Sequence, residues 1–189
     1  VLCEQPPEFP SGPYIQVESC LQALKSLAEY YRSTLSIPVI GISGSVGKTS
    51  TKEMIAPVLE QKYKVLKTEG NFNNEIGLPL TIFRIREEHE AAVLEMGISD
   101  FGEMTRLGRM ARPNICVLTN IGLCHLENLK DRDGILRAKT EMFSQAQPGA
   151  RIFLNGDDDK LLTLKESRSP SPCFFGLDPS HDLYAADIE

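Results

Sequence analysis

A glycine-rich loop between an apolar run and a helix-compatible stretch is the feature that most restricts the fold of this chain. Residues 37–42 are apolar and rich in β-branched side chains, and residues 49–59 suit a helix. The GxxGKT motif between them consists of Gly44, Ser45, Val46, Gly47, Lys48 and Thr49. Glycines let backbone N–H groups turn onto phosphate oxygens, and the following helix adds the positive end of its dipole. The motif therefore predicts a phosphate-binding loop (P-loop) between a strand and a helix.

Two side chains of this loop have predicted roles of their own. In a P-loop the lysine, here Lys48, reaches the terminal phosphates, and the hydroxyl of Thr49 completes the coordination shell of a Mg²⁺ ion. The full GxxxxGK[ST] pattern would place a glycine at Ile42, whereas this chain has its glycine one residue earlier, at Gly41. We therefore interpret the loop as a variant P-loop that binds a nucleotide.

Composition excludes several classes of protein. The chain has 189 residues, enough for one full core and part of a second domain. A net charge of −6 argues against non-specific nucleic-acid binding, which needs a basic face. No apolar run approaches the roughly 20 residues that a membrane-spanning helix needs. Five cysteines without a CxxC pair are typical of reduced thiols, and a start at Val1 without a signal peptide predicts a cytoplasmic piece of a longer protein.

Apolar segments alternate with helix-compatible segments along the chain. Ser19 and Gln22 form a capping box for a helix that ends near Arg32. Strands are predicted at residues 37–42, 63–66, 91–94, 115–119 and 151–154, and helices at 49–61, 76–85, 101–110 and 132–145. Continuous apolar strands between helices indicate an α/β fold, with a doubly wound, mainly parallel sheet in three αβα layers.

Other segments have weaker patterns. Residues 4–13 carry four prolines and are predicted to form a linker. Asp100 and Glu103 are predicted to cap the helix at 101–110. The part of the chain after about residue 155 is rich in turn-forming residues, and we assign no elements there.

Polar residues follow the predicted strands at the edge where ligands gather in open α/β sheets. Glu95 directly follows strand 91–94, and His125 lies just beyond strand 115–119. Mg²⁺ prefers oxygen ligands, so Glu95 is predicted to bind the metal, against the alternative of a solvated strand end. His125 is either a site residue or an ordinary surface or core histidine. Lys139 lies in the middle of a helix, where an exposed, ion-paired lysine is the default interpretation.

A loop at residues 68–77 is unusually rich in asparagine. Asn71, Asn73 and Asn74 lie beside glycines. Their amide groups suit a polar ligand, because each offers both donors and an acceptor. Asparagine also favours plain turns, so both interpretations remain open at this point.

The motifs taken together, in their order, resemble the central domain of the Mur ligases. The resemblance rests on residues 41–53 and 70–81, and on the motifs Leu94-Glu95-Met96-Gly97, Ala111-Arg112-Pro113, Thr119-Asn120-Ile121-Gly122, His125-Leu126-Glu127, Arg137-Ala138-Lys139 and Leu154-Asn155-Gly156-Asp157-Asp158. It covers roughly residues 15–160, and the variant P-loop is the family's own form. The Asn-rich loop and the His-Leu-Glu tripeptide are similar, in particular, to the members that join D-alanyl-D-alanine to UDP-N-acetylmuramoyl-tripeptide.

The resemblance implies an enzyme, an ATP-dependent, ADP-forming acid–amino-acid ligase of peptidoglycan synthesis and cell wall biogenesis. ATP would phosphorylate the C-terminal carboxylate of the UDP-linked peptide to give an acyl phosphate, which the amine of D-alanyl-D-alanine attacks. The partners are thus small molecules, and a monomer is expected. The resemblance also implies domains: residues 1–36 as the end of an N-terminal domain with its connecting helix, and residues 37–189 as an ATP-binding domain truncated at its C-terminus. A C-terminal Rossmann-like domain would be absent, and such a fragment is expected to be inactive alone.

The resemblance also assigns roles to individual residues. One Mg²⁺ would be held by Thr49, or Ser50 in its place, together with Glu95. A second Mg²⁺ would be held by His125 and by Lys139 carrying a carbamate. Lys48, His125 and Lys139 are the expected catalytic residues. The roles that remain are nucleotide binding by the P-loop with Asn155 and Asp158, and substrate binding by Asn71, Asn73 and Asn74.

Three alternatives compete with this interpretation. Another Mur-type ligase or a folylpolyglutamate-type ligase would share the P-loop and the lysine, but the latter would lack the Asn-Phe-Asn-Asn-Glu loop. A non-catalytic P-loop module would be expected to lose some of the set Lys48, Glu95, His125 and Lys139, all of which are present. A GTPase-like switch would need an Asn-Lys-x-Asp motif at a strand end, and none occurs at a suitable position.

Overall fold

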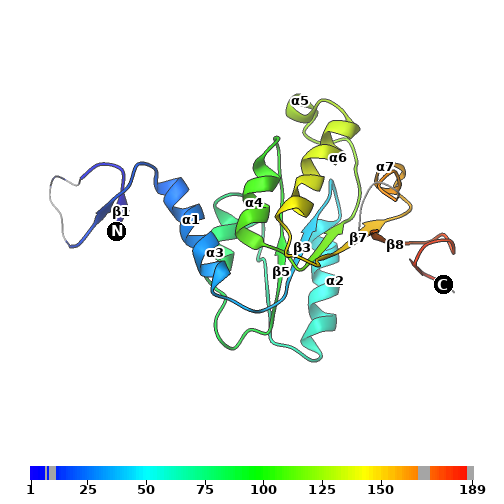
Figure 1. Ribbon diagram of the computed structural model, residues 1–189, viewed down its shortest axis with the longest axis horizontal. Helices are drawn as coiled ribbons and strands as arrows, with labels where there is room; N and C mark the ends of the chain where they lie inside the picture. Colours follow the sequence, from blue (N-terminus) through cyan, green and yellow to red (C-terminus); the bar gives the residue numbers. More distant parts are fainter. Residues whose placement is uncertain (7, 9–11, 166–170, 187–189) are drawn as a thin grey trace.

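The computed structural model describes residues 1–6, 8, 12–165 and 171–186, which form a parallel β-sheet with helices on both faces (Figure 1). Seven strands lie in the order β4-β5-β3-β6-β7-β8-β9. Their bounds are Val39–Ser43 (β3), Val65–Lys67 (β4), Ala91–Glu95 (β5), Ile115–Leu118 (β6), Arg151–Asn155 (β7), Cys173–Gly176 (β8) and Leu183–Tyr184 (β9). Each neighbouring pair is parallel. The predicted doubly wound parallel α/β fold is confirmed.

The order of the strands places the P-loop at the centre of the sheet. From β3 the chain first builds β4 and β5 on one side and then crosses to β6 on the other. Where the direction of winding reverses, the carboxyl ends of neighbouring strands leave a crevice between their loops. Ile42 of β3 pairs with Glu95 of β5, and Ser43 pairs with Leu118 of β6. The register therefore brings the P-loop between Glu95 and the loop that follows β6.

Helices cover the two faces of the sheet unequally. Their bounds are Cys20–Ser33 (α1), Lys48–Glu60 (α2), Gly77–Ile82 (α3), Glu103–Ala111 (α4), Leu126–Leu129 (α5), Arg132–Thr140 (α6) and Asp159–Leu162 (α7), with a 3₁₀ helix at Glu141–Gln145 (η1). On one face, α2 packs its Ala56 into a cluster with Ile42, Val93 and Val117. On the other face, α4, α6 and η1 pack on the sheet, and α1 and α3 lie against α4.

Both faces of the central strands are buried, which explains their continuous apolar sequence. In β5, Ala92 and Leu94 face the cluster beneath α4, whereas Val93 faces the cluster beneath α2. All three side chains are fully buried. Strands buried on both sides read as uninterrupted apolar runs and not as an alternation. The pattern that predicted a parallel sheet therefore has its cause in this packing.

The structure corrects two sequence predictions. Asp100 does not cap α4: the N-cap is Gly102, with φ 76°, and its N–H donates to the Glu141 carboxylate at 3.0 Å. The Thr105 N–H donates to the same carboxylate at 3.1 Å, so the capping group comes from another helix and local sequence cannot reveal it. The turn-rich part after residue 155, left unassigned, contains α7, β8 and β9.

The N-terminal part lies apart from the main sheet. Leu2–Cys3 (β1) and Ile15–Gln16 (β2) form a separate two-stranded parallel sheet, seen at one end of the molecule in Figure 1. Residues 7 and 9–11 of the predicted linker lie outside the described residues. The predicted helix is α1, capped by Ser19 Oγ, which accepts a hydrogen bond from Gln22 N at 3.3 Å.

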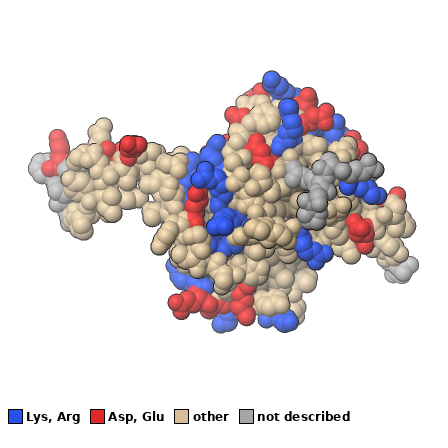
Figure 2. Space-filling view, in the orientation of Figure 1, with Lys and Arg blue, Asp and Glu red and all other residues tan. Residues whose placement is uncertain are grey.

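Charged side chains of both signs share the surface. Figure 2 shows a band of Lys and Arg side chains beside α1, with a few acidic side chains within it. Ion pairs join α1 to its neighbours: Lys25 of α1 lies 3.0 Å from Glu75, and Arg109 of α4 lies 3.3 Å from Glu29 of α1. Within the described ranges, no helix is both long and apolar enough to cross a membrane.

Candidate functional site

The P-loop follows β3 in a backbone conformation that requires glycine. Gly44 has φ 149° and Gly47 has φ 79°, in the region that L side chains rarely adopt. A Cβ atom added at Gly44 would lie 1.9 Å from Thr119 Oγ1. Ile42 is buried within β3. Because the Gly44 backbone passes so close to Thr119, glycine is required at residue 44. Residue 42 lies within the strand, so it does not need to be glycine.

The loop after β6 holds the P-loop in place. Ser45 N donates to the Asn120 carbonyl oxygen at 3.1 Å, and Val46 N donates to Asn120 Oδ1 at 3.0 Å. Lys48 is the first residue of α2, and its Nζ donates to the Gly44 carbonyl oxygen at 2.8 Å. The first turn of α2 also presents backbone N–H groups that have no acceptor within the helix. Together, these groups form a cationic, donor-rich end of a helix that suits phosphate.

Glu95 lies at the end of β5 and receives two side-chain hydrogen bonds. Thr49 Oγ1 donates to its Oε2 at 2.9 Å, and Asn73 Nδ2 donates to its Oε1 at 2.8 Å. The residue is only 2% exposed, so the alternative of a solvated strand end is wrong. The pairing of Glu95 with the P-loop threonine has the donor chemistry of a Mg²⁺ site, in which one or two carboxylates act with phosphate oxygens and water.

A buried lysine that sequence reasoning missed stands behind Glu95. Lys52 is 1% exposed, and its Nζ donates to the Thr68 carbonyl oxygen at 2.6 Å. The same Nζ lies 3.9 Å from Glu95 Oε2. Thr68 Oγ1 in turn accepts a hydrogen bond from Glu95 N at 2.9 Å. Lys52 therefore provides a positive charge next to the Glu95 carboxylate, and its place on the buried face of α2 is the signal that could have found it.

Lys139 is buried, against the default interpretation of an exposed helix lysine. It is 1% exposed, and its Nζ donates to the Gly44 carbonyl oxygen at 3.1 Å. Burial, and next to it the positive charge of Lys48, lower the pKa of Lys139 to about 8. A lysine with this pKa is about one tenth neutral at pH 7, far more than an ordinary lysine, and the neutral amine is a nucleophile.

One cleft brings together five of the predicted site residues: Lys48, Asn73, Asn74, His125 and Lys139. Its volume is about 450 Å³, and it is lined by Leu21, Lys48, Asn73, Asn74, Glu75, Ile76, Gly97, Ile98, Ser99, Glu103, His125 and Lys139. His125 is exposed there, with φ 51° in the left-handed region. Non-glycine residues in this region concentrate at functional sites. Lys48, His125 and Lys139 thus face one space, as the sequence interpretation requires.

The three asparagines of the loop before α3 occupy different positions. Asn73 binds Glu95 and lines the cleft. Asn74 also lines the cleft, but its Oδ1 accepts hydrogen bonds from Ile76 N and Gly77 N at 3.1 and 2.8 Å and so closes the turn that leads into α3. Asn71 is exposed and does not line this cleft. The turn interpretation applies to Asn74, whereas Asn73 faces the cleft and holds Glu95; ligand binding by these asparagines stays a prediction.

Glu75 is a second residue of the cleft that sequence reasoning did not single out. Partial burial acts to raise the pKa of its carboxyl, but hydrogen bonds from Arg106 and Lys25 outweigh this effect and lower it. Lys25 belongs to α1 and Arg106 to α4. Glu75 therefore ties the Asn-rich loop to two helices beside the cleft.

Asn155 and Asp158 lie outside this cleft, at the carboxyl end of β7. Asn155 Nδ2 donates to the Thr119 carbonyl oxygen at 3.0 Å. Asp158 accepts hydrogen bonds from the backbone N–H groups of Lys160, Leu161 and Ile121. Both side chains are thus engaged with the backbone of the chain itself. Ser50 is exposed in the first turn of α2.

Metal binding at this site needs oxygens from a ligand. Among the residues that the structure describes, no group of three or more His, Cys, Asp and Glu side chains is placed to hold a metal ion. Thr49 and Glu95 offer two oxygen ligands side by side, and Mg²⁺ often has no more than these from the protein because water and phosphate complete its shell. The residues present therefore fit Mg²⁺ that arrives with a nucleotide.

Comparisons with known proteins agree on one family. The family model described as the Mur ligase middle domain matches residues 42–189. A UDP-N-acetylmuramoyl-tripeptide–D-alanyl-D-alanine ligase from Bacillus subtilis (strain 168) is 46% identical over 97% of this chain and 39% of its own length. A crystal structure of MurF from Acinetobacter baumannii superposes with a TM-score of 0.92 at 32% identity, over 100% of this chain and 41% of that one. MurF from Thermotoga maritima, solved in complex with ADP, has a TM-score of 0.84 at 35% identity, over 94% and 41%. The chain thus spans about two fifths of the length of these relatives.

Proposed function

The chain belongs to the Mur ligase family, whose middle domain it matches over residues 42–189, and we propose that it supplies the ATP-binding site of a peptide ligase. The proposed reaction joins D-alanyl-D-alanine to UDP-N-acetylmuramoyl-tripeptide in peptidoglycan precursor synthesis. The relative that shares 46% of its residues carries the name of this activity. The observation that carries the proposal is the convergence of Lys48, Lys139 and the Thr49–Glu95 pair on one end of the sheet.

We propose that the phosphates of ATP lie against the N-terminus of α2. The backbone N–H groups of its first turn and the ammonium of Lys48 provide the donors. Lys48 now donates to the Gly44 carbonyl oxygen, and it would exchange this acceptor for a phosphate oxygen. The structure of MurF from Thermotoga maritima in complex with ADP supports an adenine nucleotide as the ligand.

Mg²⁺ is proposed to bind between Thr49, Glu95 and the phosphate oxygens. Bound there, it supplies positive charge to the phosphates during transfer. Asn73 holds the second oxygen of Glu95, and Lys52 stands behind the carboxylate, so the Glu95 side chain has one defined orientation. Ser50 is an alternative hydroxyl ligand in the same turn of α2.

A second Mg²⁺ is proposed to bind at His125 and Lys139, with Lys139 carrying a carbamate. The amine nitrogen of Lys139 would bond to the carbon of CO₂ and lose a proton, which converts a cation into an anionic oxygen ligand. The low pKa of Lys139, caused by burial and by Lys48, favours this reaction because only the neutral amine reacts. His125 lines the same cleft.

The chemistry proposed for the cleft needs two anions to approach each other. The peptide carboxylate would attack the γ-phosphoryl group, with ADP leaving, and the amine of D-alanyl-D-alanine would then displace phosphate from the acyl phosphate. Lys48 offsets the developing charge on the phosphoryl oxygens. Asn73 and Asn74 line the side of the cleft where the peptide would lie. Asn71 is exposed and does not line the cleft, so a role for it in substrate binding stays a prediction.

The test is phosphate release by the full-length protein that carries this sequence. The assay contains Mg-ATP, UDP-N-acetylmuramoyl-tripeptide and D-alanyl-D-alanine, each left out in turn. Release should need both peptide substrates and should vanish in Lys48→Ala. Lys62→Ala removes an exposed lysine beyond the end of α2 and should leave the rate unchanged. Release that is indifferent to D-alanyl-D-alanine would rule out the proposed substrate pair.

Several features of the proposal concern the protein as a whole. The division near residue 36, with residues 37–189 as the ATP-binding domain, stays a prediction; the family model, which begins at residue 42, supports it, whereas α1 packs against α3 and α4. Activity of this chain alone is not expected, because its relatives are more than twice as long. A monomeric state and a cytoplasmic location stay predictions.

A further inference from the structure

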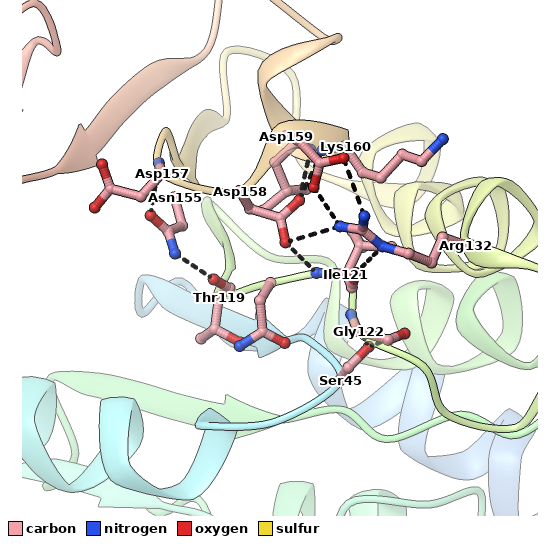
Figure 3. Close-up of polar contacts among 12 residues, drawn as sticks. Ser45, Thr119, Ile121, Gly122, Arg132, Asn155, Asp157, Asp158, Asp159 and Lys160 are labelled. Atoms are coloured by element: carbon pink, nitrogen blue, oxygen red, sulfur yellow. Dashed lines mark hydrogen bonds and ion pairs between the residues drawn. The ribbon is translucent and has the colours of Figure 1, made fainter. Parts of the chain in front are cut away.

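Side chains of opposite charge bind both polar groups of one peptide residue, Ile121 (Figure 3). Asp158 Oδ2 accepts a hydrogen bond from Ile121 N at 2.8 Å. Arg132 Nε donates to the Ile121 carbonyl oxygen at 2.7 Å. The Ile121 side chain is fully buried, so the residue is fixed on all sides. We call the pair Asp158 and Arg132 the Ile121 clamp.

Both members of the clamp are themselves held in place. Asp158 is the N-cap of α7, and its Oδ1 accepts hydrogen bonds from Lys160 N at 3.0 Å and Leu161 N at 2.9 Å. Its side chain is only 9% exposed. Arg132 is the first residue of α6, and its guanidinium pairs with Asp159 at 2.5 Å. The carboxylate and the guanidinium therefore have little freedom to turn elsewhere.

The clamped residue belongs to a segment that supports the P-loop. Thr119 Oγ1 donates to the Val46 carbonyl oxygen at 2.6 Å, and Gly122 N donates to Ser45 Oγ at 2.9 Å. Asn120, which lies between Thr119 and Gly122 in the sequence, accepts hydrogen bonds from Ser45 N and Val46 N. The segment 119–122 thus touches the Ile121 clamp on one side and the P-loop on the other, and it continues directly to His125.

We propose that Asp158 and Arg132 are positioning residues of the nucleotide site, acting through the Ile121 peptide and not by contact with the nucleotide. The clamp sets the place of segment 119–122, and that segment sets the backbone of the P-loop. Asn155 assists at the start of the segment, through its hydrogen bond to the Thr119 carbonyl oxygen. This inference replaces the nucleotide contact predicted for Asn155 and Asp158, and it rests on the proposed function only in placing a nucleotide at the P-loop.

The test measures two properties of the full-length protein that carries this sequence: amide hydrogen exchange at Ile121 and the dissociation constant for Mg-ADP. In Asp158→Asn one of the two acceptor oxygens becomes a donor, and in Arg132→Met the donor to the Ile121 carbonyl is lost. Each change should speed exchange at Ile121 and weaken ADP binding by about 10- to 100-fold, as for other residues that orient a site from behind. The double variant should bind ADP only slightly more weakly than the single variant with the lower affinity, because both side chains act on one peptide.

Two further variants separate positioning from general stability. Arg132→Lys keeps one donor for the Ile121 carbonyl and should recover most of the ADP affinity lost in Arg132→Met. Lys160→Met breaks the ion pair between Lys160 Nζ and Asp133 Oδ1 (2.6 Å), which joins the same two helices but does not touch segment 119–122. Because such an exposed ion pair contributes little to stability, the ADP affinity of Lys160→Met should stay within about threefold of that of the parent protein.

Three results would overturn the inference. Weak ADP binding in Asp158→Asn with normal binding in Arg132→Met would indicate that Asp158 contacts the nucleotide directly. An equal loss in Lys160→Met would indicate a general loosening of α6 and α7. Unchanged exchange at Ile121 in both single variants would show that the clamp does not hold the peptide. A full-length protein that binds no ADP, with or without these substitutions, would contradict the proposed function instead, and the exchange measurement would still decide the clamp.

Discussion

Lys48 and Lys139 donate hydrogen bonds to the same acceptor, the carbonyl oxygen of Gly44, over 2.8 and 3.1 Å. Lys48 belongs to α2 and Lys139 to α6, on opposite faces of the sheet. Two positive charges at one oxygen repel each other, and one of them is also buried. The pKa of Lys139 therefore falls to about 8, first through burial and then through the charge of Lys48.

This pKa predicts how stability depends on pH. Below about pH 8, Lys139 is charged in both the folded and the unfolded chain, and folding bears the full penalty of burying it. Between about pH 8 and the ordinary lysine pKa of 10.5, the folded chain has released the proton and the unfolded chain has not, so stability rises with pH. The gain should be on the order of 3 kcal/mol across this window, at about 1.4 kcal/mol for each tenfold change in proton affinity.

The measurement is denaturant unfolding between pH 7 and pH 10.5, of the chain and of Lys139→Met. The free energy of unfolding of the variant should exceed that of the parent chain at pH 7, and the difference should shrink as pH rises. Lys62→Met is the matched control, because Lys62 is exposed and its replacement should shift stability equally at every pH. A constant difference for Lys139→Met would show that this lysine keeps its ordinary pKa.

Carbamylation of Lys139 is a second prediction. With ¹³C-bicarbonate and Mg-ADP at about pH 8.5, the chain should show a carbamate carbon signal in NMR, because an amine with a pKa of about 8 is then largely neutral. Lys139→Gln should abolish the signal. Lys48→Gln should weaken it at a fixed pH, because removal of the neighbouring charge raises the pKa of Lys139. A signal that persists in Lys139→Gln would place the carbamate on another amine.

Glu95→Gln should remove the dependence of nucleotide binding on Mg²⁺. Gln keeps the volume of the side chain, but it lacks the negative charge that attracts the ion and leaves Lys52, 3.9 Å away, without that anionic neighbour. Titration with ADP, with and without Mg²⁺, should give a difference of about tenfold or more for the parent chain and almost none for the variant. Glu60→Gln changes an exposed residue at the end of α2, so ADP binding by this control should keep its full dependence on Mg²⁺. If ADP binding by Glu95→Gln also kept that dependence, the result would contradict the proposed metal site.

The parts of the fold that could be predicted from sequence are those with local causes. The apolar strands predict the sheet because residues such as Val93 and Leu94 are buried on both faces. The P-loop is predicted because its glycines and Lys48 lie within a few residues of each other. The short strands β8 and β9 were missed, since two to four residues in a turn-rich region carry too little pattern to show a strand.

The features that sequence could not reveal depend on partners far along the chain. The cap of α4 comes from Glu141, and Lys139 is buried because its helix packs over the P-loop, where Nζ meets Gly44. Lys52 is fixed by the carbonyl of Thr68. A single sequence shows that each of these residues is polar, but not which distant group satisfies it. The family resemblance predicted a role for Lys139, whereas the pattern of residues alone did not.

Gly44→Ala should damage the site through its backbone. The added Cβ would lie 1.9 Å from Thr119 Oγ1, and φ at this position is 149°, so both a clash and an unfavourable conformation arise. A cost of about 1–3 kcal/mol in the free energy of unfolding is expected. Loss of ADP affinity should accompany it, because the Gly44 carbonyl is the acceptor for both Lys48 and Lys139. Gly12→Ala is the control, since a Cβ there meets nothing within 4 Å. Thermal unfolding and ADP titration of the two variants decide the matter: if Gly44→Ala behaves like Gly12→Ala, the close approach of the P-loop to Thr119 is not what requires glycine.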